Sequence, residues 1–167
     1  MGTPLDLHPD DASIRENLRD VLINTRRRKG MSQLDLGGRL NFGSKRTASQ
    51  MELRPHWKVG TLQRWAAALG QRIIVWPECL PPDDALFLFR PADHAAAMDF
   101  DRRAFIDALA DARRWVGLSQ RRLADRLGIT DAGVAQTEKS PDVLLINAQR
   151  YCRALDSQLA IFLEVGP

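Results

Sequence analysis

Apolar residues recur at a helical period in the first part of the chain and predict one long amphipathic helix. The apolar positions that fall on one face of residues 14–29 are Ile14, Leu18, Val21 and Leu22. Ser13 and Glu16 have the spacing of a capping box, which predicts a helix start at residue 14, and Gly30 is suited to end the helix. Residues 1–12 contain two prolines and two adjacent aspartates, so we expect a flexible N-terminus.

Shorter patterns predict further helices and two strands. The helices expected next cover residues 32–40, 44–53 and 59–69. In the second half, helices are expected to begin near Arg102, Ser119, Thr130 and Asp142. β-Branched and aromatic residues predict strands over residues 72–76 and 158–164, and the apolar run Leu86–Phe89 could form another. The chain is therefore predicted to be mainly α-helical.

The two halves of the chain contain the same pattern. Gly30-Met31-Ser32-Gln33 corresponds to Gly117-Leu118-Ser119-Gln120, 87 residues later. One residue drops out near Gly43, and the correspondence continues at an offset of 86, which aligns Glu52 with Glu138. A pattern that occurs twice indicates one supersecondary unit that is used twice.

The repeat predicts two tandem units of about four helices, each followed by a short strand. The expected boundaries are a flexible segment 1–12, a first unit 13–76, a loop or linker 77–99 and a second unit 100–167. Each terminal strand would expose an edge if it stood alone. The strands could pair with each other, with Leu86–Phe89, or between two chains.

The distribution of charge indicates a polyanionic partner for the first half. Between Ser13 and Arg72 there are 13 Lys and Arg against 4 Asp and Glu, whereas from Pro91 onward there are 10 against 11. No apolar run approaches the ~20 residues that span a bilayer, and the first residues carry charge and proline but lack the apolar core of a signal peptide. We therefore expect a cytoplasmic protein, in a bacterium or a phage-infected cell, that has no membrane partner.

The sequence shows no group of residues that would predict a disulfide, a metal site or a catalytic site. Cys79 and Cys152 occupy unmatched positions of the repeat and are expected to be free thiols. The three histidines are scattered, so we expect no metal site. No catalytic motif is recognisable, and we expect neither enzyme activity nor a cofactor.

Both repeats resemble the Cro/C1-type (Xre-like) helix-turn-helix family. The motif is Ser-Gln-x-x-Leu-x-x-x-Leu, a turn, and a Ser or Thr that opens a short helix ending at Glu, and it begins at Ser32 and at Ser119. The resemblance implies double-stranded DNA as the partner, with the third helix of each unit in the major groove. It also implies that Gln33 and Gln120, at the start of the second helix, help to bind phosphate.

The third helix of the first unit carries side chains that can bind the edges of DNA bases. We expect Ala48 and Met51 to face the core. Arg can bind guanine through two hydrogen bonds, Gln can bind adenine, and basic residues after the helix suit phosphates. The candidate DNA-binding residues of the first unit are Gln33, Ser44, Lys45, Arg46, Thr47, Ser49, Gln50, Arg54 and Lys58. Trp57 could stack on a base, whereas the other tryptophans are expected in the core.

The third helix of the second unit has fewer side chains that can bind base edges, and two interpretations of this unit remain open. Asp131 repels phosphate but can accept a hydrogen bond from cytosine, and Ala132 can only touch a thymine methyl. The unit could bind mainly the DNA backbone, or it could bind protein instead. Its candidate DNA-binding residues are Gln120, Arg121, Thr130, Asp131, Ala132, Gln136 and Lys139.

These features together predict a sequence-specific transcriptional regulator, and a repressor in particular. We expect a monomer in which the two units form a pseudo-dimer on an asymmetric operator, with a homodimer as the alternative. The rival interpretation is an antitoxin-like adaptor whose helical units bind a protein partner.

Overall fold

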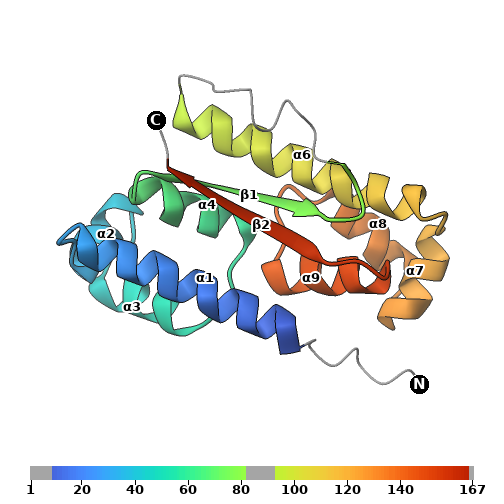
Figure 1. Cartoon of the computed structure of the whole chain (residues 1–167), viewed down its shortest axis with the longest axis horizontal. Helices are drawn as coiled ribbons and strands as arrows, with labels where there is room; N and C mark the ends of the chain where they lie inside the picture. The colour runs from blue at the N-terminus through green and yellow to red at the C-terminus, as the bar shows by residue number, and fades with distance from the viewer. Residues whose placement is uncertain (1–8, 82–92, 166–167) are drawn as a thin grey trace.

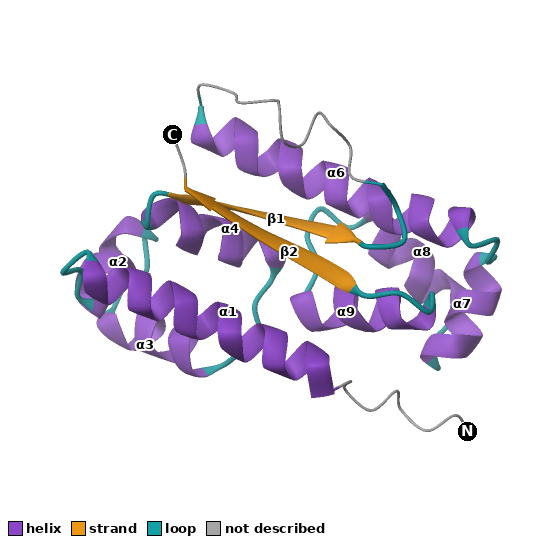
Figure 2. Ribbon diagram, viewed as in Figure 1, coloured by secondary structure: helices purple, strands orange, loops and turns teal. Residues whose placement is uncertain are grey.

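The computed structural model describes residues 9–81 and 93–165, in which four helices and a strand occur twice in the same order (Figure 1). The first set is α1 (Pro9–Arg28), α2 (Gln33–Arg39), α3 (Lys45–Leu53), α4 (Val59–Ala68) and β1 (Gln71–Pro77). The second set is α6 (His94–Trp115), α7 (Gln120–Leu127), α8 (Asp131–Lys139), α9 (Leu145–Ala154) and β2 (Leu159–Val165). The prediction of a mainly helical fold with two tandem units, each ending in a short strand, is confirmed (Figure 2).

Hydroxyl side chains fix the starts of the short helices as the sequence predicts. The residues whose hydroxyls accept a backbone NH three positions later are Ser32, Ser44, Ser119 and Thr130. Each of these bonds satisfies one NH group that has no partner within the helix. Asp35 completes a capping box at α2, and Asn41 takes the left-handed conformation after it, with φ 55°.

Helix α1 begins earlier than predicted. Because it starts at Pro9, Ser13 lies inside it and donates its hydroxyl to the Pro9 carbonyl (3.1 Å) instead of capping the helix. Proline has a helical φ and no NH to leave unpaired, and the aspartates that follow favour the positive end of a helix. Residues 9–12 are therefore helical rather than flexible.

Helix α6 also begins earlier, at His94 instead of Arg102, so the expected linker 77–99 includes its first turns. Asp93 caps it by accepting the NH of Ala95 (3.0 Å). The alanines that follow lack an amphipathic pattern but have the highest helix propensity, which is why periodicity alone missed this start. The possible strand Leu86–Phe89 lies outside the described residues.

Helix α9 begins at Leu145 rather than at Asp142. The Asp142 carboxylate accepts the NH of Val143 (2.8 Å) and, across the repeat, the NH of Gly60 in the first turn of α4 (3.1 Å). A Cβ on Gly60 would lie 2.6 Å from that carboxylate. A side chain from the second unit therefore binds a helix start of the first, and Asp142 does not begin its own helix.

The two strands pair with each other in an antiparallel sheet and relate the units by a pseudo-two-fold axis. Val75 pairs with Ile161, and these residues occupy equivalent positions of the repeat, 86 residues apart. An isolated bridge joins Lys58 and Leu144, which are again 86 residues apart. Because a two-fold axis passes midway between equivalent residues, it runs through the centre of each of these pairs, and we call it the pseudo-dyad.

One hydrophobic core serves both units, since buried residues of both halves belong to one contiguous cluster. Polar contacts also cross between the halves in equivalent ways. The Gln149 amide donates to the Asp11 carbonyl (3.1 Å), and the Gln63 amide donates to the Met98 carbonyl (2.9 Å). The fourth helix of each unit therefore binds the first helix of the other. Asp11, 3% exposed, also pairs with Arg153 (2.8 Å).

The shared core predicts a single cooperative unfolding transition. Leu22 and Leu109 are equivalent residues and are both fully buried. Replacing either with Ala should lower the free energy of unfolding by about 2–5 kcal/mol, because each leaves a cavity in the same core. Calorimetry and urea unfolding of the two variants measure this. Two separate transitions, each sensitive to only one of the substitutions, would contradict a shared core.

Candidate nucleic-acid interface

A buried ion pair positions the third helix of the first unit. Arg26 of α1 and Glu52 of α3 lie 2.7 Å apart, with side chains 8% and 5% exposed. Arg26 also donates to the Met31 carbonyl (2.7 Å), and the Gln33 amide of α2 donates to Glu52 (2.7 Å). One carboxylate thus binds side chains of both preceding helices, which fixes the orientation of α3.

The second unit repeats this network. Arg113 and Glu138 lie 2.7 Å apart, Arg113 donates to the Leu118 carbonyl (2.8 Å), and the Gln120 amide donates to Glu138 (2.8 Å). Tyr151 adds a hydroxyl that donates to Glu138 (2.6 Å). Neither network was predicted from the sequence, although the recurrence of Arg, Gln and Glu at matched positions of the repeat was a signal for both.

Hydrogen bonds keep the Glu138 carboxylate ionised despite its burial. Burial alone would raise the pKa of Glu138, but the bonds from Arg113, Tyr151 and Gln120 outweigh it, so the pKa lies below its ordinary value. The same pairing raises the pKa of Arg113. Burial and the bond to Glu138 raise the pKa of Tyr151, which keeps its hydroxyl protonated as the donor.

Helix α3 has a buried face and an exposed polar face. Ala48 and Met51 are 0% and 8% exposed, as predicted. The exposed candidates on and after this helix are Lys45, Arg46, Thr47, Gln50, Arg54 and Lys58, and Ser49 is half-buried. The Ser44 hydroxyl is occupied by the cap of α3. The exposed set offers guanidinium, ammonium, amide and hydroxyl groups to a ligand, and its binding to DNA stays a prediction.

Helix α8 has an exposed face with fewer hydrogen-bonding groups. The candidates exposed on it and beside it are Arg121, Thr130, Asp131, Ala132, Gln136 and Lys139. The Thr130 hydroxyl caps the helix, and the Asp131 carboxylate accepts the NH of Ala132 (2.9 Å). The remaining side chains that can donate to a ligand are therefore two cations and one amide. This composition suits backbone contacts better than base reading.

The glutamines at the starts of α2 and α7 have a structural role that the sequence did not suggest. Each uses its amide nitrogen to bind the carboxylate that positions the third helix. A Gln amide nitrogen carries two hydrogens, so one remains for a further acceptor. Phosphate binding by Gln33 and Gln120 stays a prediction.

Two tryptophans differ from expectation. Trp57 is 3% exposed, packs edge-on against Trp65 with ring centroids 5.8 Å apart, and donates its indole NH to the Met51 carbonyl (2.7 Å). It belongs to the core and cannot stack on a base. Trp115, expected in the core, is 70% exposed at the end of α6.

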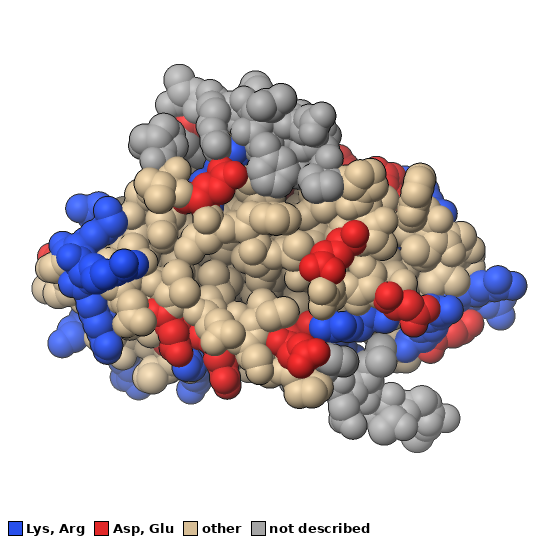
Figure 3. All heavy atoms as spheres, viewed as in Figure 1, with Lys and Arg blue, Asp and Glu red and all other residues tan. Residues whose placement is uncertain are grey.

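Helices α3 and α8 lie toward opposite ends of the molecule in this view, as expected for two helices related by the pseudo-dyad (Figure 1). On the face shown in Figure 3, Lys and Arg side chains gather at the end of the molecule where α1 ends and α2 lies. The charge asymmetry of the sequence is therefore also visible on this surface.

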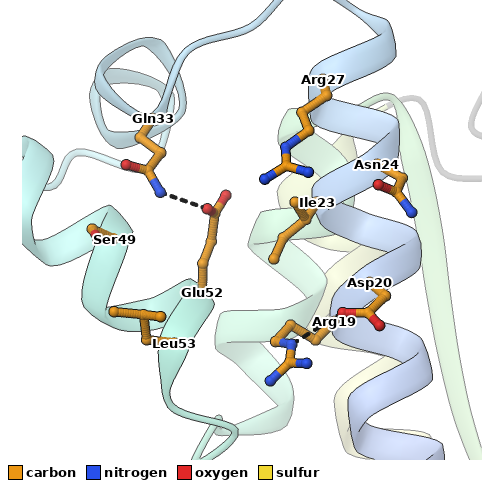
Figure 4. A pocket seen from close by; sticks show the side chains of 9 residues that line it. All are labelled: Arg19, Asp20, Ile23, Asn24, Arg27, Gln33, Ser49, Glu52 and Leu53. Carbon is orange, nitrogen blue, oxygen red and sulfur yellow. Dashed lines mark hydrogen bonds and ion pairs between the residues drawn. The ribbon is translucent and has the colours of Figure 1, made fainter.

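An open groove of about 580 Å³ adjoins α3 in the first unit (Figure 4). Arg19, Ile23 and Arg27 line it from α1, and Gln33 and Leu53 line it from the opposite wall. Leu53 is 66% exposed. Asp20 and Glu52 also line the groove, which therefore contains cationic, acidic and apolar groups next to the candidate DNA-binding face.

Two curated proteins are similar to part of the chain. Both are named antitoxin HigA1 and come from Mycobacterium tuberculosis, one from strain CDC 1551 / Oshkosh and one from strain ATCC 25618 / H37Rv. Each is 42% identical to the chain over 66 residues, which are 39% of this chain and 44% of the relative. The chain thus spans less than half the length of these relatives. No family model and no solved structure matches the chain.

Residues 9–81 and 93–165 contain neither a candidate membrane span nor a candidate metal site. None of their helices combines the length and apolar character needed to cross a membrane. No three His, Cys, Asp or Glu side chains within these ranges are grouped so that they could hold a metal ion.

The Glu138 network predicts a pH-dependent contribution to stability. Because the folded-state pKa of Glu138 is depressed, its contribution is present at neutral pH and is lost as pH falls through that pKa. Glu138→Gln should lower the free energy of unfolding at pH 7 by about 3–5 kcal/mol, because Arg113 stays buried without a counter-charge. The deficit relative to the native chain should shrink in acid.

Urea unfolding from pH 7 to pH 3 measures this deficit, and Asp125→Asn, an exposed site on α7, is the matched control. A deficit that stays constant across this pH range would show that the ionised carboxylate is not the source of the stability.

Proposed function

We propose that the chain is a sequence-specific double-stranded DNA-binding regulator of transcription, and that it acts as a repressor in the bacterial cytoplasm. One observation carries the proposal: α3 and α8 are equivalent helices related by a pseudo-dyad, and each has an exposed face. Two helices in this relation can enter successive major grooves on one side of a duplex, where half-sites lie about 34 Å apart.

The exposed side chains of the two units suit different parts of the DNA. Arg46 can bind guanine through two hydrogen bonds and Gln50 can bind adenine, so α3 reads bases. The second unit offers Arg121 and Lys139, which suit phosphates and set the register. The first and second units thus share their geometry but differ in surface chemistry.

The proposal includes an asymmetric operator that is bound by one chain. Cro/C1-type regulators use two chains to reach two half-sites, whereas both units are present here in one body. Binding of the second unit is then intramolecular and needs no second chain. Because the third helices differ at nearly every exposed position, the half-sites that they read must differ too.

A second candidate function comes from the similar proteins. Their name, antitoxin HigA1, favours a chain that also binds a protein toxin. The exposed apolar residues beside α3 are compatible with a protein surface. The two functions do not exclude each other.

Selection of bound duplexes from random DNA, followed by affinity measurements across a salt series, tests the proposal. A regulator should enrich one sequence and lose affinity steeply with salt, because it releases counterions from phosphates. No enrichment together with a flat salt dependence would refute DNA binding and leave protein binding as the function.

Base reading by α3 predicts a sequence-dependent loss when Arg46 is replaced. Arg46→Ala should cost about 1–3 kcal/mol of binding free energy on the selected operator and should relax preference at one base pair. Fluorescence anisotropy against operators that vary at each position measures this, with Arg28→Ala at the exposed end of α1 as the control. An equal loss on every sequence would show that Arg46 binds backbone instead.

Backbone binding by the second unit predicts a change in salt dependence. Arg121→Ala should lower the slope of log affinity against log salt by about one, because one phosphate is no longer neutralised. An unchanged slope with unchanged affinity would favour the interpretation in which the second unit binds protein.

A further inference from the structure

The groove between α1 and α3 contains an arginine whose charge is not compensated within the protein. Arg27 lines this groove, and its side chain extends from α1 into it (Figure 4). Among residues 9–81 and 93–165, no group forms an ion pair or a hydrogen bond with the Arg27 guanidinium. The other charged side chains of the groove have partners, since Arg19 lies 3.2 Å from Asp20 and Glu52 is bound by two side chains. An anion that enters the groove therefore meets Arg27 as a free positive charge.

The second unit has an arginine at the equivalent position, but a carboxylate neutralises it. Arg114 lies 87 residues after Arg27, and its guanidinium is 2.9 Å from Asp111, three residues earlier on α6. The first unit has Asn24 in place of Asp111, and Asn24 lines the groove without carrying a charge. Because residues three apart on a helix are neighbours, this one difference decides whether the arginine has an internal counter-charge.

The free guanidinium lies next to the surface that we propose binds DNA. Ser49 and Leu53 of α3 line the same groove, and Ser49 directly precedes the candidate base-binding residue Gln50. Gln33 lines the groove as well, and its amide nitrogen keeps one hydrogen beyond the bond to Glu52. A duplex whose major groove receives α3 carries a phosphate backbone along each side of that helix. The mouth of the groove is therefore a place where a phosphate can meet donors from α1 and α2.

We propose that Arg27 binds a backbone phosphate at the mouth of this groove, and that Asn24 keeps the arginine available by leaving it without a counter-charge. The proposal rests on the DNA-binding function and deepens it, because it adds a phosphate site to the first unit that the second unit lacks. A guanidinium suits this ligand, since its N–H groups match two phosphate oxygens at once. An acidic protein segment could use the same cation, but the position of the groove beside the exposed face of α3 favours DNA.

Salt dependence on the selected operator tests the charge. Arg27→Ala should lower the slope of log affinity against log salt by about one. Asn24→Asp should give the same loss although Arg27 remains, because it introduces the counter-charge that Asp111 supplies in the second unit. Arg114→Ala is the matched control and should leave the slope nearly unchanged. Equal thermal unfolding of the three variants and the native chain shows that the fold is retained.

A scan of single phosphates tests whether the contact is direct. Operators are prepared with one uncharged methylphosphonate at each position in turn. The native chain and Arg114→Ala should bind about tenfold more weakly at one position beside the first half-site, as expected for the loss of a charged hydrogen bond. Arg27→Ala and Asn24→Asp should lose no further affinity at that position.

Two results would overturn the proposal. One is an unchanged salt slope for Arg27→Ala or for Asn24→Asp. The other is a phosphate scan in which Arg27→Ala loses as much as the native chain at every position. Absence of any enriched operator would instead refute the DNA-binding function itself.

Discussion

The antiparallel pairing of β1 with β2 is the constraint on which the rest of the structure depends. It places Val75 opposite its own equivalent, Ile161, and so turns two consecutive segments of chain into two halves around one axis. The same pairing gives each strand a partner for the edge it would otherwise expose. The side-chain contacts between the fourth helix of one unit and the first helix of the other then follow from the symmetry, and the core becomes continuous.

The elements that local signals encode were predictable from sequence, whereas contacts between the halves were not. Ser32, Ser44, Ser119 and Thr130 cap the helices that they were expected to cap, because a cap is a property of three or four neighbouring residues. Asp142 failed as a helix start because its carboxylate binds Gly60 from the other unit, a contact that no local pattern reveals. The pairing of the strands with each other was one of three arrangements that the sequence allowed.

The features of the candidate interface that follow from helical periodicity were predictable from sequence, whereas those that depend on contacts between helices were not. The direction in which Ala48 and Met51 point follows from helical periodicity, and the exposed polar face of α3 follows with it. The burial of Trp57 depends on an aromatic contact with Trp65 in the next helix, so a residue expected at the surface lies in the core. The Arg26–Glu52 and Arg113–Glu138 pairs join helices that only the fold brings together.

The two units share one framework but differ in the chemistry of their surfaces. Leu34 and Leu53 of the first unit are 62% and 66% exposed, and their equivalents in the second unit are Arg121 and Lys139. The third helix of the first unit thus carries Lys45 and Arg46 together with an exposed leucine at its end, whereas that of the second unit carries Asp131 and Glu138 and ends at Lys139. Duplication within one chain allows this divergence, because a homodimer must carry the same residues on both halves.

The central claim is that one chain supplies both halves of the DNA-binding body. The most direct test is the mass of the complex between the full chain and its selected operator, measured by light scattering or native mass spectrometry. The account predicts one chain per duplex, on a site whose two halves differ in sequence. Two chains on a palindromic duplex would contradict it.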